Sequence, residues 1–137
     1  MQVTRAADYA IRVIIHLAGM PVGSWASHTQ LAEAAECPPQ FLSKVLQRLT
    51  RAGLVVSHRG NAGGFELPAA RRKATLLDVV EAIEGPIHLN SCLDQCTPCS
   101  RLNWCPAHTV WDAAQSSLRS ILSSAVIDEL ARETKWS

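Results

Sequence analysis

The chain has 137 residues, 47% of them hydrophobic, and carries a formal net charge of +1. This length is typical of one domain with an appendage and allows a buried core. No stretch reads as a signal peptide or approaches the roughly 20 apolar residues that span a bilayer, so we expect a cytoplasmic protein without a membrane partner.

The charge is unevenly distributed along the chain. Basic residues outnumber acidic ones in the middle, and acidic residues outnumber basic ones after residue 73. The basic residues of the middle segment are Lys44, Arg48, Arg51, Arg59, Arg71, Arg72 and Lys73, with Glu66 as its one acidic residue. Such a segment predicts a surface for a polyanion, although a solvated face fits the charges alone equally well.

The N-terminal segment predicts a largely buried helix over residues 3–19, with Thr4 as its N-cap. Its polar residues Asp8, Arg12 and His16 recur at every fourth position and therefore share one face. An ion pair between Asp8 and Arg12 is the simplest role for two of them.

Two short helices joined by a tight turn follow. Thr29 is expected to cap a helix over residues 30–36, and prolines then start a second helix over residues 39–52. This pattern predicts a helix-turn-helix whose second helix is the recognition helix. We expect Lys44, Arg48 and Arg51 to contact phosphates, and Gln40, Ser43 and Gln47 to read bases.

The next segment predicts a β-hairpin, because the β-prone residues 54–56 and 65–67 flank a glycine-rich basic tip. The backbone at such a tip can approach nucleic acid closely, and an arginine there can enter the minor groove. The candidate contacts are Arg59, Gly60 and Asn61. Helix-turn-helix and hairpin together predict a winged helix-turn-helix that binds double-stranded DNA.

The C-terminal part predicts three further helices. Thr75 caps the first, over residues 76–84; the second is long, from Ala107 to about Ala125; and the third covers residues 126–132. The long helix carries an apolar heptad seam of Ala107, Trp111, Ala114, Leu118, Ile121 and Ala125. Packing within the chain would explain such a seam, but its place beyond a complete winged domain favours a homodimer on a pseudo-palindromic operator.

Four of the five cysteines lie within fourteen residues, spaced C-x3-C-x2-C-x5-C: Cys92, Cys96, Cys99 and Cys105. Clustered thiols in a cytoplasmic protein indicate metal binding or redox chemistry more than disulfides. Their crowding suits a soft metal centre held by a loop and favours iron-sulfur over zinc, whose sites usually present two separated pairs. The fifth cysteine, Cys37, is expected to be a small buried hydrophobic residue.

The predicted fold is mainly α with a small β-hairpin wing. Residues 1–85 form the winged helix-turn-helix domain, residues 86–106 the cysteine loop, and residues 107–137 the dimerisation helix and the C-terminal helix. No arrangement of nucleophile, base and orienting group is present, so we do not expect an enzyme.

Four stretches of the chain resemble the Rrf-two family of winged-helix transcription regulators, which includes IscR-like and NsrR-like members. They are residues 8–12, residues 41–49 with 52–55, residues 59–67, and residues 92–108. The resemblance covers nearly the whole chain. It implies a homodimeric DNA-binding regulator that senses redox state, nitric oxide or iron-sulfur status through a 4Fe-4S or 2Fe-2S cluster.

The resemblance leaves three ligand sets open. Cluster-binding members carry three cysteines, whose positions match Cys92, Cys99 and Cys105. The fourth ligand is then Asp8 of the partner's first helix, as in NsrR-like members, or His108, as in IscR-like members. Since Cys96 is an extra thiol, all four cysteines can also bind one cluster within a subunit. Zinc or a thiol switch is the alternative for a regulator, and a small iron-sulfur electron carrier is the alternative outside that class.

Overall fold

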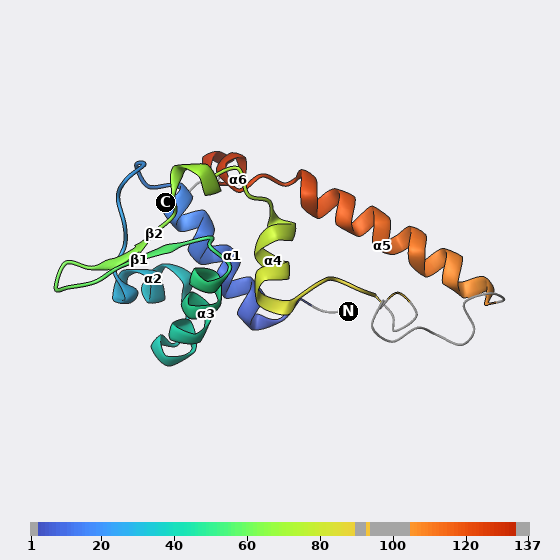
Figure 1. Ribbon diagram of the computed structural model, residues 1–137, viewed down its shortest axis with the longest axis horizontal. Helices are drawn as coiled ribbons and strands as arrows, with labels where there is room; N and C mark the ends of the chain where they lie inside the picture. The colour runs from blue at the N-terminus through green and yellow to red at the C-terminus, as the bar shows by residue number, and fades with distance from the viewer. Residues whose placement is uncertain (1–2, 90–92, 94–104, 134–137) are drawn as a thin grey trace.

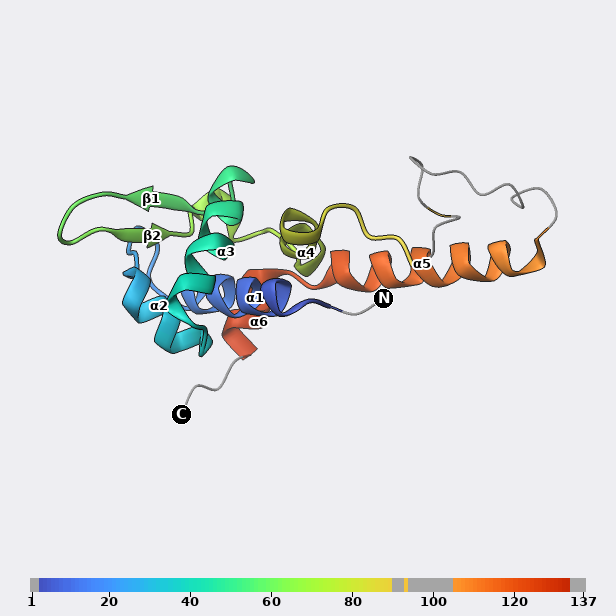
Figure 2. The same cartoon turned by 90° about the horizontal axis from the view of Figure 1, so that it is seen from below.

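The computed structural model describes residues 3–89, 93 and 105–133. Its helices are α1 (Arg5–Ala18), α2 (His28–Ala35), α3 (Pro39–Arg51), α4 (Leu76–Glu84), α5 (Pro106–Ser124) and α6 (Ile127–Glu133), with the short 3-10 helix η1 (Ala69–Arg71) and the strands β1 (Val56–His58) and β2 (Gly64–Glu66). Figures 1 and 2 show α1 to α4, α6 and the hairpin gathered at one end of the molecule, while α5 extends away from them. The predicted, mainly helical fold with a small wing is confirmed.

Helix α1 is the centre of this body. The Thr4 side chain accepts a hydrogen bond from the Ala7 backbone N–H (3.2 Å), so the predicted N-cap is confirmed. The buried face of α1 includes Ala10, Val13 and Ile14, and the helix contacts α2, α3, α4 and α6. Burial of apolar area contributes roughly 25 cal/mol per Å², so this face stabilises the body.

Helix α2 begins two residues earlier than predicted, because Ser27 rather than Thr29 is its N-cap. The Ser27 hydroxyl accepts from the Gln30 backbone N–H (3.2 Å), and the Gln30 side chain accepts from the Ser27 N–H (2.9 Å). This reciprocal capping box satisfies two donors at the start of the helix. The prediction of Thr29 was wrong, although a serine followed three residues later by glutamine is the sequence signature of such a box.

The two strands of the hairpin pair antiparallel, with Ser57 opposite Phe65. The first strand starts two residues later than predicted, because Leu54 and Val55 are buried in the core instead of joining the ladder. The second strand starts at Gly64, one residue earlier than predicted. β-Propensity identified the apolar residues but did not separate those that pack from those that pair.

Arg72 has an internal role that its place in the basic segment did not suggest. Its guanidinium donates to the backbone carbonyls of Ala18 (2.6 Å), Met20 (2.7 Å) and Leu17 (3.4 Å) at the end of α1. The last carbonyls of a helix have no partner within it, and the cation also compensates the negative end of the helix dipole.

Replacing Arg72 with glutamine is expected to lower the free energy of unfolding by about 1.5–3 kcal/mol, because these carbonyls lose a charged donor. Urea denaturation followed by circular dichroism measures the change. Arg71→Gln, on the neighbouring exposed arginine, is the matched control and is expected to change stability by less than about 0.5 kcal/mol. Equal effects of the two substitutions would contradict the role assigned to Arg72.

Within the described ranges, none of the helices combines the length and the apolar character that crossing a membrane requires.

Candidate functional site

The recognition helix α3 separates a buried face from a polar one. Its buried residues are Leu42, Val45, Leu46 and Leu49, and the candidate DNA contacts Gln40, Ser43, Lys44, Gln47, Arg48 and Arg51 are all exposed. Pro38 and Pro39 start the helix where a missing N–H costs nothing. The structure therefore brings these six residues to one helix surface.

Two of these contacts already have partners within the chain. Ser43 Oγ lies 2.9 Å from His28 Nε2 and donates to the Pro39 carbonyl (3.2 Å). Arg48 donates to the Ile83 carbonyl near the end of α4 (3.1 Å). Their DNA roles stay predictions, and for Arg48 a phosphate contact would compete with this bond.

The wing presents Arg59, Gly60 and Asn61 at an exposed tip. Gly60 has φ = 108°, a conformation that side chains with Cβ rarely adopt. The hairpin packs closely against the body at Gly64, the first residue of β2 after the turn, where an added Cβ would lie 2.7 Å from the Ala26 carbonyl carbon. The glycines thus allow both the turn and the close packing of the wing against the body.

Of the proposed cluster ligands, Cys92, Cys96 and Cys99 lie outside the described residues. Cys105 is a free, partly buried cysteine at the N-cap of α5, and the His108 backbone N–H donates to its carbonyl (3.2 Å). The Nδ1 atom of His108 is buried without a hydrogen-bond partner. A neutral imidazole nitrogen is a common metal ligand, so His108 stays a candidate.

Asp8 lies elsewhere in the same chain. Its carboxylate pairs with Arg12 (3.1 Å) on α1, and both side chains are about half exposed. Figure 1 shows α1 within the body, whereas α5 begins at its end away from the body. Cys105 is the N-cap residue of that end. Across the described ranges, no cluster of three or more His, Cys, Asp or Glu side chains could hold a metal ion. The structure of one chain thus pairs Asp8 with Arg12, and its role as a ligand stays a prediction.

Cys37, the fifth cysteine, is 5% exposed and packs within the main core. Burial raises the pKa of its thiol by desolvating the thiolate. The prediction that it is a small buried residue is confirmed, because its side chain is almost inaccessible to solvent.

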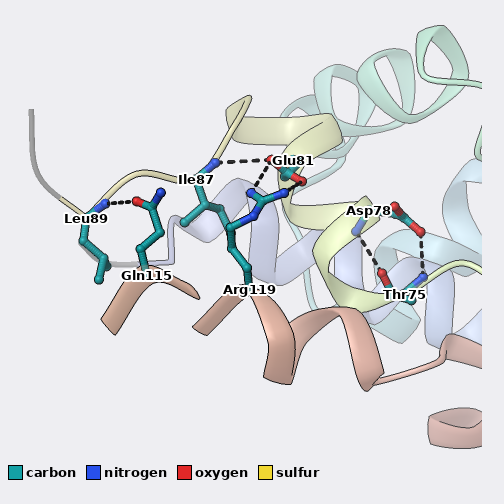
Figure 3. Close-up of polar contacts among 7 residues, drawn as sticks. All are labelled: Thr75, Asp78, Glu81, Ile87, Leu89, Gln115 and Arg119. Carbon is teal, nitrogen blue, oxygen red and sulfur yellow. Dashed lines mark hydrogen bonds and ion pairs between the residues drawn. The ribbon is translucent and has the colours of Figure 1, made fainter. Parts of the chain in front are cut away.

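The segment that leads into the cysteine loop is held between α4 and α5, as Figure 3 shows. Glu81 of α4 accepts from the Ile87 backbone N–H (3.3 Å) and from Arg119 of α5 (3.1 Å). Two residues further along, the Leu89 N–H donates to the Gln115 side chain (2.9 Å). Residues 87–89 are therefore hydrogen-bonded to both helices, so their position depends on how α4 and α5 lie relative to each other.

The C-terminal end of α4 also contacts the recognition helix α3 and the segment before α1. Arg48 of α3 bonds the Ile83 carbonyl, and the Thr4 N–H before α1 donates to the Glu84 carboxylate (2.8 Å). Helix α4 thus links the approach to the cysteine loop with the recognition helix through polar contacts one turn apart.

Helix α5 has no buried residue in the described chain. Leu118 and Leu122 pack partly against α4, while Val110 (66% exposed), Trp111 (42%) and Ile121 (67%) are uncovered. Members of the predicted seam thus differ in burial, because Leu118 packs against its own chain whereas Trp111, on the same helix face, is exposed. Val110, Trp111 and Ile121 are called the exposed stripe of α5 below, and the seam omitted Val110.

Comparison with known proteins gives a match to Rrf2, described as an iron-dependent transcriptional regulator family, over residues 3–133. The chain belongs to the Rrf2 family.

Relatives and solved structures agree with this membership. An HTH-type transcriptional regulator of Mycobacterium tuberculosis, Rv1287, is 34% identical over 96% of this chain and 81% of its own length. The protein aau3 of Rhizobium meliloti is 31% identical over 96% of this chain and 86% of its own. CymR, the global cysteine regulator of B. subtilis, superposes with a TM-score of 0.75 at 26% identity over 98% of this chain and 99% of its own. IscR of T. potens shares the fold, with a TM-score of 0.71 at 23% identity over 98% and 89%.

Members of the Rrf2 family are transcription regulators, so the protein is a DNA-binding regulator and not an enzyme. Sequence patterns missed several residues of the site, namely Trp25 beside the wing and Glu81, Gln115 and Arg119 around the loop. A short-range pattern could not have identified them, because each acts on a residue at least six positions away.

Proposed function

We propose that this Rrf2 regulator binds a pseudo-palindromic operator as a homodimer, with an affinity controlled by an iron-sulfur cluster held by the cysteine loop. The observation that carries the proposal is the unpartnered, buried Nδ1 of His108, one helical turn after Cys105. A thiolate and an imidazole at this spacing follow three further cysteines in the sequence. Thiolate and imidazole donors suit iron-sulfur centres.

The residues of this region fit such a group. Cys105 is a free cysteine at the N-cap position of α5 and is therefore free for ligation. His108 lies seven residues before Gln115 and therefore on the α5 face that holds Leu89. When bound, a cluster supplies a centre whose charge and integrity change on oxidation or on reaction with nitric oxide.

The three ligand sets that the family resemblance leaves open remain candidates. In the first, Cys92, Cys99 and Cys105 act with His108, whose unpartnered nitrogen supports this set. In the second, the four cysteines act together. In the third, the partner's Asp8, which pairs with Arg12 in the single chain, replaces His108. Native mass spectrometry of His108→Ala, Cys96→Ala and Asp8→Ala separates the sets by which variant loses the cluster.

The exposed stripe of α5 supports the dimer. Three large apolar side chains lie uncovered along a helix that leaves the body of the chain, and such patches mark interaction surfaces. A second copy of α5 is the partner that a short heptad seam favours. Two recognition helices would then face successive major grooves of a symmetric operator.

The polar contacts of α4 supply a route from loop to DNA. A change in the cysteine loop would move residues 87–89. Because Glu81 bonds both Ile87 and Arg119, the movement would change the position of α4 relative to α5. The Arg48 bond to Ile83 would carry it to the recognition helix. A coupling of about 1–3 kcal/mol is enough for a useful switch.

The proposal is tested by selecting an operator from genomic DNA and measuring its affinity for anaerobic holo and apo protein across a salt titration. An iron-sulfur chromophore with matching iron and sulfide contents, and affinities that differ about 5- to 150-fold, are expected. Equal affinities at every salt concentration would reject cluster control. A colourless protein loaded with zinc, or one that responds only to thiol oxidation, would favour the alternative regulators.

Replacing Glu81 with alanine is expected to bring the holo-to-apo affinity ratio to within about twofold of one, because the link between loop and helices is lost. Fluorescence anisotropy with labelled operator measures both affinities. The matched control is Asp128→Ala, which removes the exposed Asp128–Arg132 pair (3.0 Å) on α6 and is expected to keep the wild-type ratio. A wild-type ratio in Glu81→Ala would show that coupling does not pass through this carboxylate.

A further inference from the structure

Trp25 is a large aromatic residue outside the core. It lies in the loop between α1 and α2, is 40% exposed, and does not belong to the hydrophobic clusters of the described chain. Burial in the core therefore does not explain its position. Its side-chain contacts are with the wing.

The indole holds the wing in two ways. Its ring stacks on the His58 imidazole at the end of β1, with centroids 4.1 Å apart and planes 15° from parallel. Its Nε1–H donates to the Ala62 carbonyl (2.8 Å), within the turn that carries Arg59, Gly60 and Asn61. One rigid side chain thus contacts both a strand and the tip.

The backbone beside Trp25 joins the hairpin as well. Ala26 and Phe65 exchange two backbone hydrogen bonds (3.1 and 2.8 Å), forming an antiparallel bridge on the β2 side. Across the hairpin, His58 Nε2 lies 2.7 Å from a Glu66 carboxylate oxygen. Trp25, His58 and Glu66 therefore form a polar and aromatic layer that ties both strands to the loop before α2.

A two-stranded hairpin is only marginally stable by itself. Each degree of freedom that the tip loses on binding DNA weakens the affinity, so a tip ordered in advance binds more tightly. Trp25 can order the tip in this way because it hydrogen-bonds Ala62 and stacks on His58, two residues that lie on either side of Arg59 in the sequence.

We propose that Trp25 is a positioning residue for DNA binding, which orders the wing tip so that Arg59 reaches the DNA. It acts through Ala62 and His58 and does not itself touch a base. The proposal rests on the DNA-binding role of the wing in the proposed function, but not on the metal or its ligands.

The test is a double-mutant cycle on a selected operator, with fluorescence anisotropy as the readout. Trp25→Ala is expected to weaken binding about tenfold, and Trp25→Phe, which keeps an aromatic ring but loses the N–H, about threefold. In an Arg59→Ala background, both substitutions are expected to have almost no further effect, because they act through the same contact. Trp25→Phe is the smaller change and is less disruptive to the fold than Trp25→Ala. Circular dichroism checks that both variants are folded.

Ser24→Ala is the matched control, since the Ser24 hydroxyl bonds the Pro21 carbonyl of its own turn and the affinity is expected to stay unchanged. Equal losses for Trp25→Phe with and without Arg59 would overturn the positioning role, as would an unchanged affinity in both Trp25 variants. A wild-type protein that binds no DNA would overturn the proposed function and the role of Trp25 together. A wild-type protein that binds DNA with an affinity independent of Trp25 would overturn the role of Trp25 alone, so the two failures are distinguishable.

Discussion

Ile121→Glu is expected to convert the proposed dimer into a monomer. Ile121 is 67% exposed in the single chain, in the same stripe as Val110 and Trp111. A carboxylate at this point would have to be buried without a partner in a helix pair, which is strongly unfavourable. Analytical ultracentrifugation would show the loss of the dimer.

The monomer would hold a single half-site, so operator affinity is expected to fall by about 10²- to 10⁴-fold as the linked second contact is lost. Ser120→Glu is the matched control, because it adds the same charge one residue away, on an exposed position off the stripe. A dimer that persists in Ile121→Glu would mean that this stripe of α5 is not the interface.

Cys105→Ser is expected to abolish the iron-sulfur chromophore and to leave the protein with the DNA affinity of the apo form. Cys105 belongs to every ligand set proposed above, and serine is a poor replacement for a thiolate at a soft metal. Iron and sulfide determination after anaerobic purification gives the first readout, and operator affinity gives the second.

Cys37→Ala is the matched control for this variant. Cys37 is buried in the core, and burial raises the pKa of its thiol, so its thiolate is disfavoured as a ligand. The chromophore is expected to survive in Cys37→Ala at a modest cost in stability. Full iron and sulfide contents in Cys105→Ser would exclude this residue from the site.

Much of the fold followed from local patterns. Apolar periodicity predicted α1, α3 and α4, and Thr4 and Thr75 were identified as caps because a hydroxyl next to an apolar run has a short-range partner. Errors arose where two local solutions compete. Ser27 and Thr29 are both suitable caps, and only the capping box with Gln30 distinguishes them.

The candidate site was predictable to the extent that its residues are close in the sequence. The spacing of the cysteines predicted a metal site without any fold, and the family resemblance added His108 as a candidate ligand. The assignment of Asp8 depends on a second chain. In one chain, Asp8 is paired with Arg12, the simple role that its helical spacing also predicted.

Side-chain roles between distant segments depended on the tertiary structure. Arg48 and Arg72 belong to the same basic segment, yet one bonds the end of α4 and the other the end of α1. Trp25 reaches a carbonyl 37 residues away. Periodicity and capping act over a few residues, so sequence alone identified the elements and the cysteine cluster. Partners for a charge or an indole are set by which helix ends and turns the folded core brings near, and only the packed chain contains that information.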